Sequence, residues 1–230
     1  VGQFCTNPGL LIALKGADLD AFVETAAAEL GQVGGAAMLT DRVSSAYHHV
    51  TDAMAGHAKV TCALKRRDSD GPFEGSPAIF RTTAADWQAN PELAEEMFGP
   101  AGIIVECDTP EEMVALSATL IGQLTATVHM VDADAELAGK LRPALEKCAG
   151  RILINGWPTG VEVCHSMVHG GPYPASTDSR ATSVGSLAIK RFIRPVSYQA
   201  FPDALLPEAL KDANPLNIPR LVNGKWQMPK

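Results

Sequence analysis

The sequence has no apolar run that could cross a membrane and no broad excess of positive charge. A spanning helix needs about 20 consecutive apolar residues, and no run among these 230 residues approaches that length. The formal net charge is −7, whereas proteins that bind nucleic acid or anionic lipid present basic patches that neutralise phosphate. The one basic run, residues 65–67, is followed at once by Asp68 and Asp70, as is typical of a solvated loop. We therefore expect neither a membrane nor a nucleic acid as partner.

Recognisable motifs for metals, phosphates and dinucleotides are absent as well. The five cysteines include no Cys-x-x-Cys pair and the six histidines no His-Glu-x-x-His pair, so we expect no metal site. The sequence contains neither a Gly-x-Gly-x-x-Gly fingerprint nor a Walker loop, the usual signs of a nucleotide-binding unit. An odd number of scattered cysteines favours a reducing compartment, and we expect a cytoplasmic protein.

The chain does contain apolar runs that alternate with amphipathic stretches. In the first expected helix Phe22, Ala26 and Leu30 share one face, and Thr40 is the expected N-cap of the second. A strand-helix-strand order implies right-handed crossovers. The sequence therefore predicts an α/β fold with a largely parallel sheet covered by helices. Strands are expected over residues 10–14, 59–64, 78–82, 102–107, 124–130 and 151–155, and helices over residues 17–30, 41–55, 91–97, 110–121 and 133–148.

The composition changes after residue 156, where glycine, proline, serine and threonine become frequent. The segment 188–196 is apolar with three basic residues, and its pattern predicts one exposed strand. Beyond Phe201 the chain continues as a tail rich in proline. The sequence has no internal repeat and no low-complexity segment.

Two short motifs carry side chains suited to catalysis. A Gly-Gln-Phe-Cys motif ends at Cys5, and a Glu-Met-Phe-Gly-Pro motif begins 91 residues later at Glu96. A thiolate is a strong nucleophile, and a carboxylate on a Gly-Pro turn can accept hydrogen bonds from two vicinal hydroxyls. Taken singly, each motif also has an ordinary explanation, an inert small apolar residue for Cys5 and a solvated helix end for Glu96.

Together the motifs resemble those of the aldehyde dehydrogenase superfamily. Gly-Gln-x-Cys is similar to the family's nucleophile motif, Glu-x-Phe-Gly-Pro to its cofactor turn, and residues 152–163 to the strand and loop at its aldehyde entrance. The turn that begins at His169 stands where many members have Phe-Gly-Gly-x-Lys. With residues 177–185, it resembles the branch of α-ketoglutarate semialdehyde (2,5-dioxovalerate) dehydrogenases and an NADP-preferring fatty-aldehyde dehydrogenase.

The resemblance implies a function for this chain. The expected reaction is oxidation of an aldehyde to its acid through a cysteine thiohemiacetal and a thioester, with α-ketoglutarate semialdehyde the leading substrate and an aliphatic aldehyde the second. NAD or NADP is the implied cofactor. The residues implied are Cys5 as nucleophile, Glu96 and Phe98 as cofactor contacts, and Phe4, Trp157, Thr159 and Val161 as substrate contacts.

The resemblance also implies an organisation. Residues 1–170 are expected to form the catalytic domain, and residues 171–230 a C-terminal segment whose strand joins subunits into a homodimer or a higher homo-oligomer. In the family the cofactor-binding domain, the glutamate general base and an asparagine oxyanion donor all precede the nucleophile. We therefore expect this chain to be a C-terminal fragment that is inactive alone.

Two other functions agree with the residues themselves. Any of the six histidines could fold beside Cys5, which would give a Cys-His thiol hydrolase or acyltransferase. Alternatively, the chain could be a non-catalytic fragment that serves only assembly. In either enzyme Cys5 is the expected reactive thiol, because Cys62, Cys107 and Cys148 fall in apolar patterns.

Overall fold

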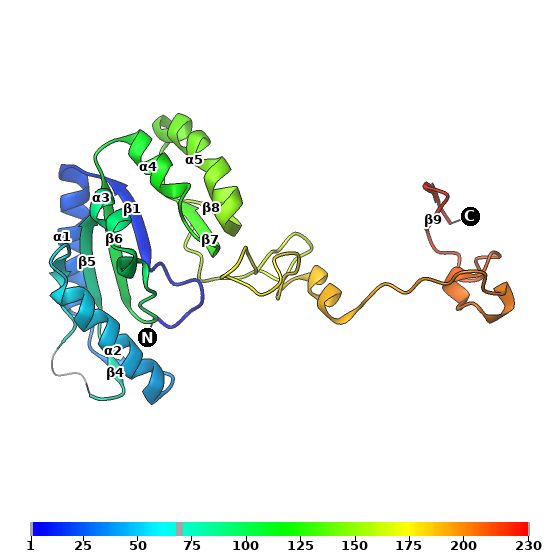
Figure 1. The fold of residues 1–230 in the computed structure, drawn as a ribbon, viewed down its shortest axis with the longest axis horizontal. Helices are drawn as coiled ribbons and strands as arrows, with labels where there is room; N and C mark the ends of the chain where they lie inside the picture. Colours follow the sequence, from blue (N-terminus) through cyan, green and yellow to red (C-terminus); the bar gives the residue numbers. More distant parts are fainter. Residues whose placement is uncertain (1, 68–70, 230) are drawn as a thin grey trace. The chain divides into compact units, whose positions relative to one another are not determined.

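A mostly parallel sheet forms the centre of the fold. The computed structural model describes residues 2–67 and 71–229, which form two units, Val1–Arg191 and Phe192–Lys230. In the first unit, strands β1, β6 and β5 run parallel (Figure 1), and β3 closes one edge of the sheet as an antiparallel strand. The α/β fold predicted from the sequence is confirmed. The strands, in sheet order, are β1 (Leu10–Leu14), β6 (Ala101–Cys107), β5 (Ala78–Thr83) and β3 (Thr61–Leu64).

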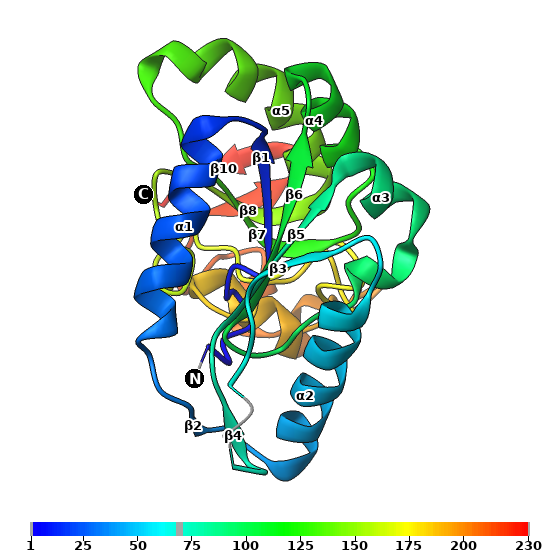
Figure 2. The ribbon, with the colours of Figure 1, turned by 90° about the vertical axis from the view of Figure 1, so that its left-hand side faces the viewer.

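Helices cover both faces of this sheet, as Figure 2 shows with α1 on one side and α2 and α3 on the other. Side chains alternate between the two faces of a strand, so Ile104 of β6 packs on the α1 side of the sheet and Ile103 on the α2 side. Burial on both faces explains why β6 consists almost wholly of apolar residues, with Glu106 as its one charged residue, and why β5 begins with the apolar run Ala78, Ile79 and Phe80. The helices are α1 (Ala17–Gly31), α2 (Asp41–Gly56), α3 (Ala84–Ala89) and α4 (Pro110–Ser117).

The start of α2 agrees with its sequence signal. Thr40 is extended, and its hydroxyl accepts a hydrogen bond of 3.2 Å from the backbone N–H of Val43. This satisfies one of the free donors of the first helical turn. The buried face of α2 carries Tyr47 and Met54, which belong to the largest apolar cluster of the unit.

A second parallel pair follows the central sheet. Strands β7 (Gln123–Val128) and β8 (Ala149–Ile154) are connected by η2 (Asp132–Asp134) and α5 (Ala135–Cys148). Leu141 and Leu145 of α5 pack against this pair. The Asn155 side chain closes its end, since its oxygen accepts from the N–H of Met130 at 2.7 Å and its NH2 donates to the Met130 carbonyl at 2.8 Å. These bonds fix the start of the loop after β8.

Three expectations about individual elements are wrong. On α1 the core side chains are Leu19 and Val23, and Ala26 packs against them as expected, whereas Phe22 and Leu30 are exposed because they lie outside the stripe that faces the sheet. The helix expected to reach residue 121 ends at Ser117, whose hydroxyl donates to a carbonyl of the preceding turn. The helix expected over residues 91–97 is only the 3-10 turn η1 (Pro91–Ala94).

The strand expected over residues 188–196 is also absent. Ser186–Phe192 forms the 3-10 helix η3, and the residues that follow belong to no strand. Within the described chain this segment has no strand beside it, and β preference depends on such neighbours. Two small pieces that sequence patterns did not indicate, β2 (Ala36–Ala37) and β4 (Glu74–Gly75), pair beside the start of α2.

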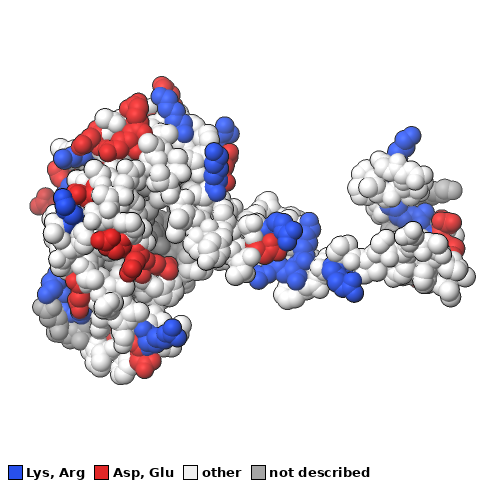
Figure 3. Space-filling view, viewed as in Figure 1, with Lys and Arg blue, Asp and Glu red and all other residues white. Residues whose placement is uncertain are grey.

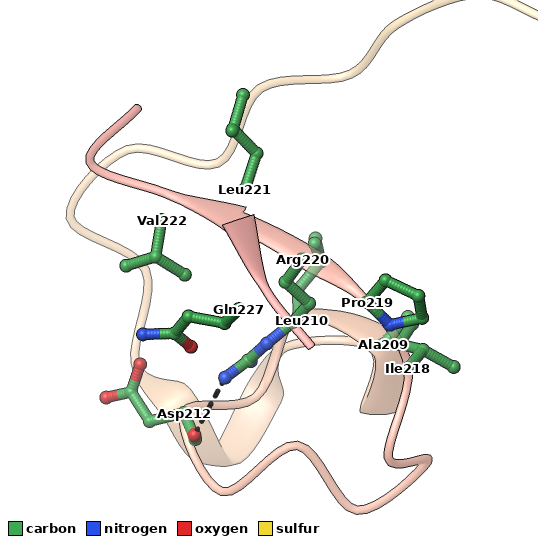
Figure 4. A pocket seen from close by; sticks show the side chains of 9 residues that line it. All are labelled: Ala209, Leu210, Asp212, Ile218, Pro219, Arg220, Leu221, Val222 and Gln227. Atoms are coloured by element: carbon green, nitrogen blue, oxygen red, sulfur yellow. Dashed lines mark hydrogen bonds between the residues drawn. The ribbon is translucent and has the colours of Figure 1, made fainter. Parts of the chain in front are cut away.

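The second unit holds a short hairpin and a pocket. Strands β9 (Arg220–Val222) and β10 (Lys225–Gln227) are joined by Asn223 and Gly224, which both have positive φ, as a two-residue turn of this kind requires. The 3-10 turns η4 (Asp203–Leu205) and η5 (Glu208–Leu210) precede it. The Arg220 guanidinium donates to the backbone carbonyls of Lys211 and Asp212, and Asp212 lines the pocket (Figure 4). The pocket is lined by Ala209, Leu210, Asp212, Ile218, Pro219, Arg220, Leu221, Val222 and Gln227.

The described residues form neither a membrane-spanning helix nor a cluster of metal ligands. Within residues 2–67 and 71–229, no helix is long and apolar enough to cross a bilayer. The same residues contain no group of three or more histidine, cysteine, aspartate or glutamate side chains placed to hold a metal ion. On the face of the first unit drawn in Figure 3, acidic and basic side chains are interspersed.

Candidate active site

The sheet brings the motif that ends at Cys5 and the motif that begins at Glu96 to the same edge. Strands β1 and β6 are parallel neighbours, with Leu10 paired to Ile103. The segment that ends at Cys5 leads into β1, and the turn that begins at Glu96 leads into β6. Because the starts of parallel strands meet at one edge, the two segments lie together although 91 residues separate them (Figure 1).

Direct contacts join the two motifs. The Asn7 side chain donates a hydrogen bond of 3.1 Å to the Gly99 carbonyl. Gly2, with a φ of +57°, lies so close to the turn that a Cβ there would be 2.8 Å from the Pro100 Cα. Only glycine accepts both the conformation and the approach. The cysteine segment is therefore packed onto the Glu96–Pro100 turn.

The Glu96–Pro100 turn packs on a buried tyrosine, Tyr47. A Cβ at Gly99 would be 2.5 Å from a ring carbon of Tyr47, so only glycine fits there. Tyr47 is 1% exposed, and its hydroxyl donates to the Ser76 carbonyl at 2.7 Å. Met97 of the same turn is buried, Phe98 is half-buried and Glu96 is exposed. The fold thus holds the turn rigidly while it leaves the carboxylate available.

Cys5 lies in a tight turn on the surface of the first unit. The Asn7 N–H donates to the Phe4 carbonyl at 2.9 Å and closes this turn. The Cys5 side chain is exposed, as is the neighbouring Phe4. Its sulfur lies 3.4 Å from Nε2 of His169. Of the six histidines that the sequence left open, the structure therefore places His169 against the thiol.

Sequence reasoning did not assign His169 to the site. The contact spans 164 residues and joins two irregular segments, so no periodicity indicates it. The one available signal was that His169 opens the turn that replaces Phe-Gly-Gly-x-Lys. An imidazole beside a thiol can accept its proton and so produce the nucleophilic thiolate.

The other expected substrate contacts lie on the loop after β8. Arg151 of β8 holds this loop by donating to the carbonyls of Pro158 and Gly160. Trp157 is 70% exposed, and the centroid of its ring lies 5.1 Å from the centroid of the His129 ring. Thr159 is exposed and Val161 half-buried. Among the described residues, no hydrogen bond or ring contact joins these three side chains to Cys5.

The remaining cysteines differ in accessibility. Cys107 and Cys148 are buried, as expected, but Cys62 is exposed because β3 is the edge strand of its sheet. Burial raises the pKa of the Cys107 thiol to about 11, with Glu112 and Asp108 adding to the effect. Burial likewise raises the pKa of Cys148, and partial desolvation raises that of Cys62 against the opposing charge of Lys65.

Two known proteins of similar sequence are α-ketoglutaric semialdehyde dehydrogenases. The chain is 47% identical over 225 residues to α-ketoglutaric semialdehyde dehydrogenase 2 of Azospirillum brasilense, with 98% of the chain and 43% of the relative covered. It is 41% identical to α-ketoglutaric semialdehyde dehydrogenase of Acinetobacter baylyi, with 97% of the chain and again 43% of the relative covered. The chain thus spans less than half the length of either relative. No family model matches it.

Solved structures show the same fold at lower identity. The chain matches Δ-pyrroline-5-carboxylate dehydrogenase of Mycobacterium tuberculosis bound with NAD at a TM-score of 0.65 and 19% identity, over 89% of the chain and 40% of that protein. It matches succinic semialdehyde dehydrogenase of Streptococcus pyogenes in complex with NADP+ at a TM-score of 0.64 and 19% identity, over 84% and 42%. Given its 47% identity over 225 residues to the first of these relatives, the chain belongs to the aldehyde dehydrogenase superfamily.

Proposed function

We propose that this chain supplies the catalytic cysteine and part of the cofactor site of an NAD(P)-dependent aldehyde dehydrogenase that oxidises α-ketoglutarate semialdehyde to its acid. The observation that carries the proposal is the packing of the Cys5 segment onto the Glu96–Pro100 turn. A nucleophile and a carboxylate turn held together in this way suit an enzyme that binds a reactive aldehyde beside a ribose. The two semialdehyde dehydrogenase relatives support the substrate.

The residues present fit a nicotinamide cofactor at its ribose end. The Glu96 carboxylate is exposed next to the rigid turn, where it could accept hydrogen bonds from two vicinal hydroxyls. Phe98 presents a half-buried ring on the same turn. A bound nicotinamide would supply the acceptor for the hydride that leaves the substrate. In this proposal NAD or NADP is held by Glu96 and Phe98 on this chain.

The chemistry of the chain's own residues starts at Cys5. His169 Nε2 lies at hydrogen-bond distance from the sulfur and accepts its proton. The thiolate then adds to the aldehyde carbon, which gives a thiohemiacetal with a negatively charged oxygen. Loss of hydride from that carbon gives a thioester, and water cleaves it to the acid and the free thiol. Phe4, Trp157, Thr159 and Val161 are the proposed substrate contacts.

Protection of Cys5 by the aldehyde tests this proposal on the chain itself. Reversible addition of α-ketoglutarate semialdehyde to the thiolate blocks the sulfur, so it should slow alkylation of Cys5 by iodoacetamide. Slowing of about tenfold is expected when the aldehyde is present at ten times its dissociation constant. Peptide mapping by mass spectrometry gives the rate at each cysteine, and Cys62 serves as the exposed control.

Four results separate the alternatives for this test. Hexanal should protect less at equal concentration if the site prefers a semialdehyde that carries a carboxylate. α-Ketoglutarate, which lacks the aldehyde, should not form the adduct. Equal loss of reactivity at Cys5 and Cys62 would mean non-specific addition, and unchanged alkylation of Cys5 would leave the non-catalytic assembly fragment as the better interpretation.

A cofactor-independent thiol hydrolase is the second candidate, and the contact between Cys5 and His169 favours it. This pair is sufficient in principle for acyl transfer. The two candidates share the nucleophile but differ in whether a hydride acceptor is needed. Multiple turnovers of an activated ester without NAD or NADP would support the hydrolase, and release of at most one equivalent of product would oppose it.

We further propose that the chain forms a homo-oligomer in the cytoplasm. All five cysteines are free, which fits a reducing compartment. The second unit exposes large apolar side chains, among them Phe192 at 84% and Trp226 at 70%, and burial of such residues in an interface is favourable. Light scattering checks this assembly, and a monomer at micromolar concentration would contradict it.

A further inference from the structure

We infer that the Thr182 hydroxyl is the positioning group that holds His169 against Cys5. The inference rests on the proposed function of Cys5 and His169 as a reacting pair. It concerns residues 177–185, which the sequence singled out and to which the proposed chemistry gives no part. Thr182 is 5% exposed, although its side chain is polar.

The His169 ring makes few contacts of its own that could fix its orientation. Nε2 faces the Cys5 sulfur at 3.4 Å. Nδ1 is buried and has no hydrogen-bond partner among the described residues. His169 also lies outside any helix or strand. The position of the ring therefore depends on how the backbone of this residue is held.

Thr182 and Ser183 hold that backbone on both sides. The His169 N–H donates to Thr182 Oγ1 at 2.8 Å, while the Ser183 N–H and hydroxyl both donate to the His169 carbonyl, at 3.0 and 2.9 Å. The neighbouring Gly170 lies so close to Ala181 that a Cβ at Gly170 would be 2.7 Å from the Ala181 carbonyl oxygen. The His169 turn thus lies flat against residues 181–183.

The Thr182 hydroxyl uses its whole hydrogen-bonding capacity in this arrangement. It accepts from the N–H of His169 at 2.8 Å and of Val184 at 3.3 Å, and it donates to the Val184 carbonyl at 2.7 Å. One donor and two acceptor positions are all that a hydroxyl has. Removal of this oxygen would leave partly buried backbone groups of His169 and Val184 unpaired, so the turn would shift and His169 would lose its contact with the sulfur.

The test compares alkylation rates of Cys5 in matched variants of the full chain. Thr182→Val keeps the shape and removes the hydroxyl, and Thr182→Ser keeps the hydroxyl. Thr51→Val is the control, because Thr51 is 1% exposed and its hydroxyl donates to the Tyr47 carbonyl at 2.8 Å in α2, away from Cys5. His169→Gln gives the rate without the imidazole. Rates at pH 7 with iodoacetamide are read at Cys5 by peptide mapping.

We expect His169→Gln to slow alkylation of Cys5 roughly tenfold, because less thiolate forms without the imidazole. Thr182→Val should reproduce most of that loss, while Thr182→Ser and Thr51→Val keep the wild-type rate. In the His169→Gln background, Thr182→Val should have no further effect. If Thr182→Val fails to fold, as judged by circular dichroism, Thr182→Ala takes its place.

Distinct outcomes overturn the inference. A folded Thr182→Val or Thr182→Ala chain with the wild-type rate at Cys5 would exclude a positioning role. Equal slowing by Thr182→Val with and without His169 would indicate a general structural role instead. If His169→Gln itself has no effect, the pair and the inference both fail, whereas protection of Cys5 by the aldehyde reports separately on the proposed function.

Discussion

Replacement of Cys5 by alanine should lower aldehyde oxidation by roughly 10⁴-fold or more, as expected when a covalent nucleophile is removed. The measurement needs a complete enzyme. Such an enzyme can be built by joining this chain to the part of the Azospirillum brasilense relative that the chain does not match, given 47% identity in the matched part. Reduced cofactor, followed by absorbance with α-ketoglutarate semialdehyde and NAD or NADP, gives the rate.

Cys62→Ala is the matched control for this experiment, because Cys62 is the other exposed cysteine of the first unit and lies on the edge strand β3. Its activity should stay within about twofold of the parent chimera, since it makes no contact with the reacting atoms. Oxidation that survives Cys5→Ala in a folded chimera would exclude Cys5 as the nucleophile. An active parent would also show that an enzyme containing this chain uses NAD or NADP.

Alkylation of Cys107 at pH 8 should be about 250-fold slower than that of an ordinary exposed thiol. Burial raises the pKa of Cys107 to about 11, so only about one thiol in a thousand is ionised at pH 8, whereas an unperturbed thiol is roughly one quarter thiolate. The thiol form persists at neutral pH, and thiolate appears only as the pH rises toward 11.

The measurement is the iodoacetamide rate at each cysteine between pH 7 and pH 10. The rate at Cys107 should increase about tenfold per pH unit throughout this range, whereas the rate at Cys5 should be the highest of the five at pH 8. In urea all five cysteines should react at similar rates, which shows that the differences come from the fold. Labelling of Cys107 or Cys148 ahead of Cys5 in the folded chain would contradict the assignment of Cys5 as the reactive thiol.

The parts of the fold that depend on local signals were predictable from the sequence. The strand over residues 10–14 and the N-cap at Thr40 correspond to the observed β1 and α2. Both depend on interactions within a few residues, namely an apolar run and a hydroxyl near a free N–H. The hairpin at Asn223 and Gly224 has an equally local signal, which the description of this region as a proline-rich tail overlooked.

The parts that depend on distant partners were not predictable. Phe22 and Val23 are both apolar, and only the position of α1 over the sheet decides that Val23 is buried. The prediction of a strand over residues 188–196 was wrong for the same reason. An apolar pattern does not reveal whether a partner strand lies beside the segment. At the site, Cys5 and Glu96 were indicated by their motifs, but His169 became a site residue only through the fold.

The distance in sequence between Cys5 and His169 also has a consequence for how the protein is made. Pairing of Leu10 with Ile103 closes a loop of about 90 residues, a kind of contact that slows folding. His169 follows Cys5 by 164 residues, which a ribosome adds in roughly 10 to 30 s at usual rates of synthesis. The Cys5 thiol therefore leaves the ribosome well before His169 exists, and the two side chains stay apart until nearly all of the first unit has been translated.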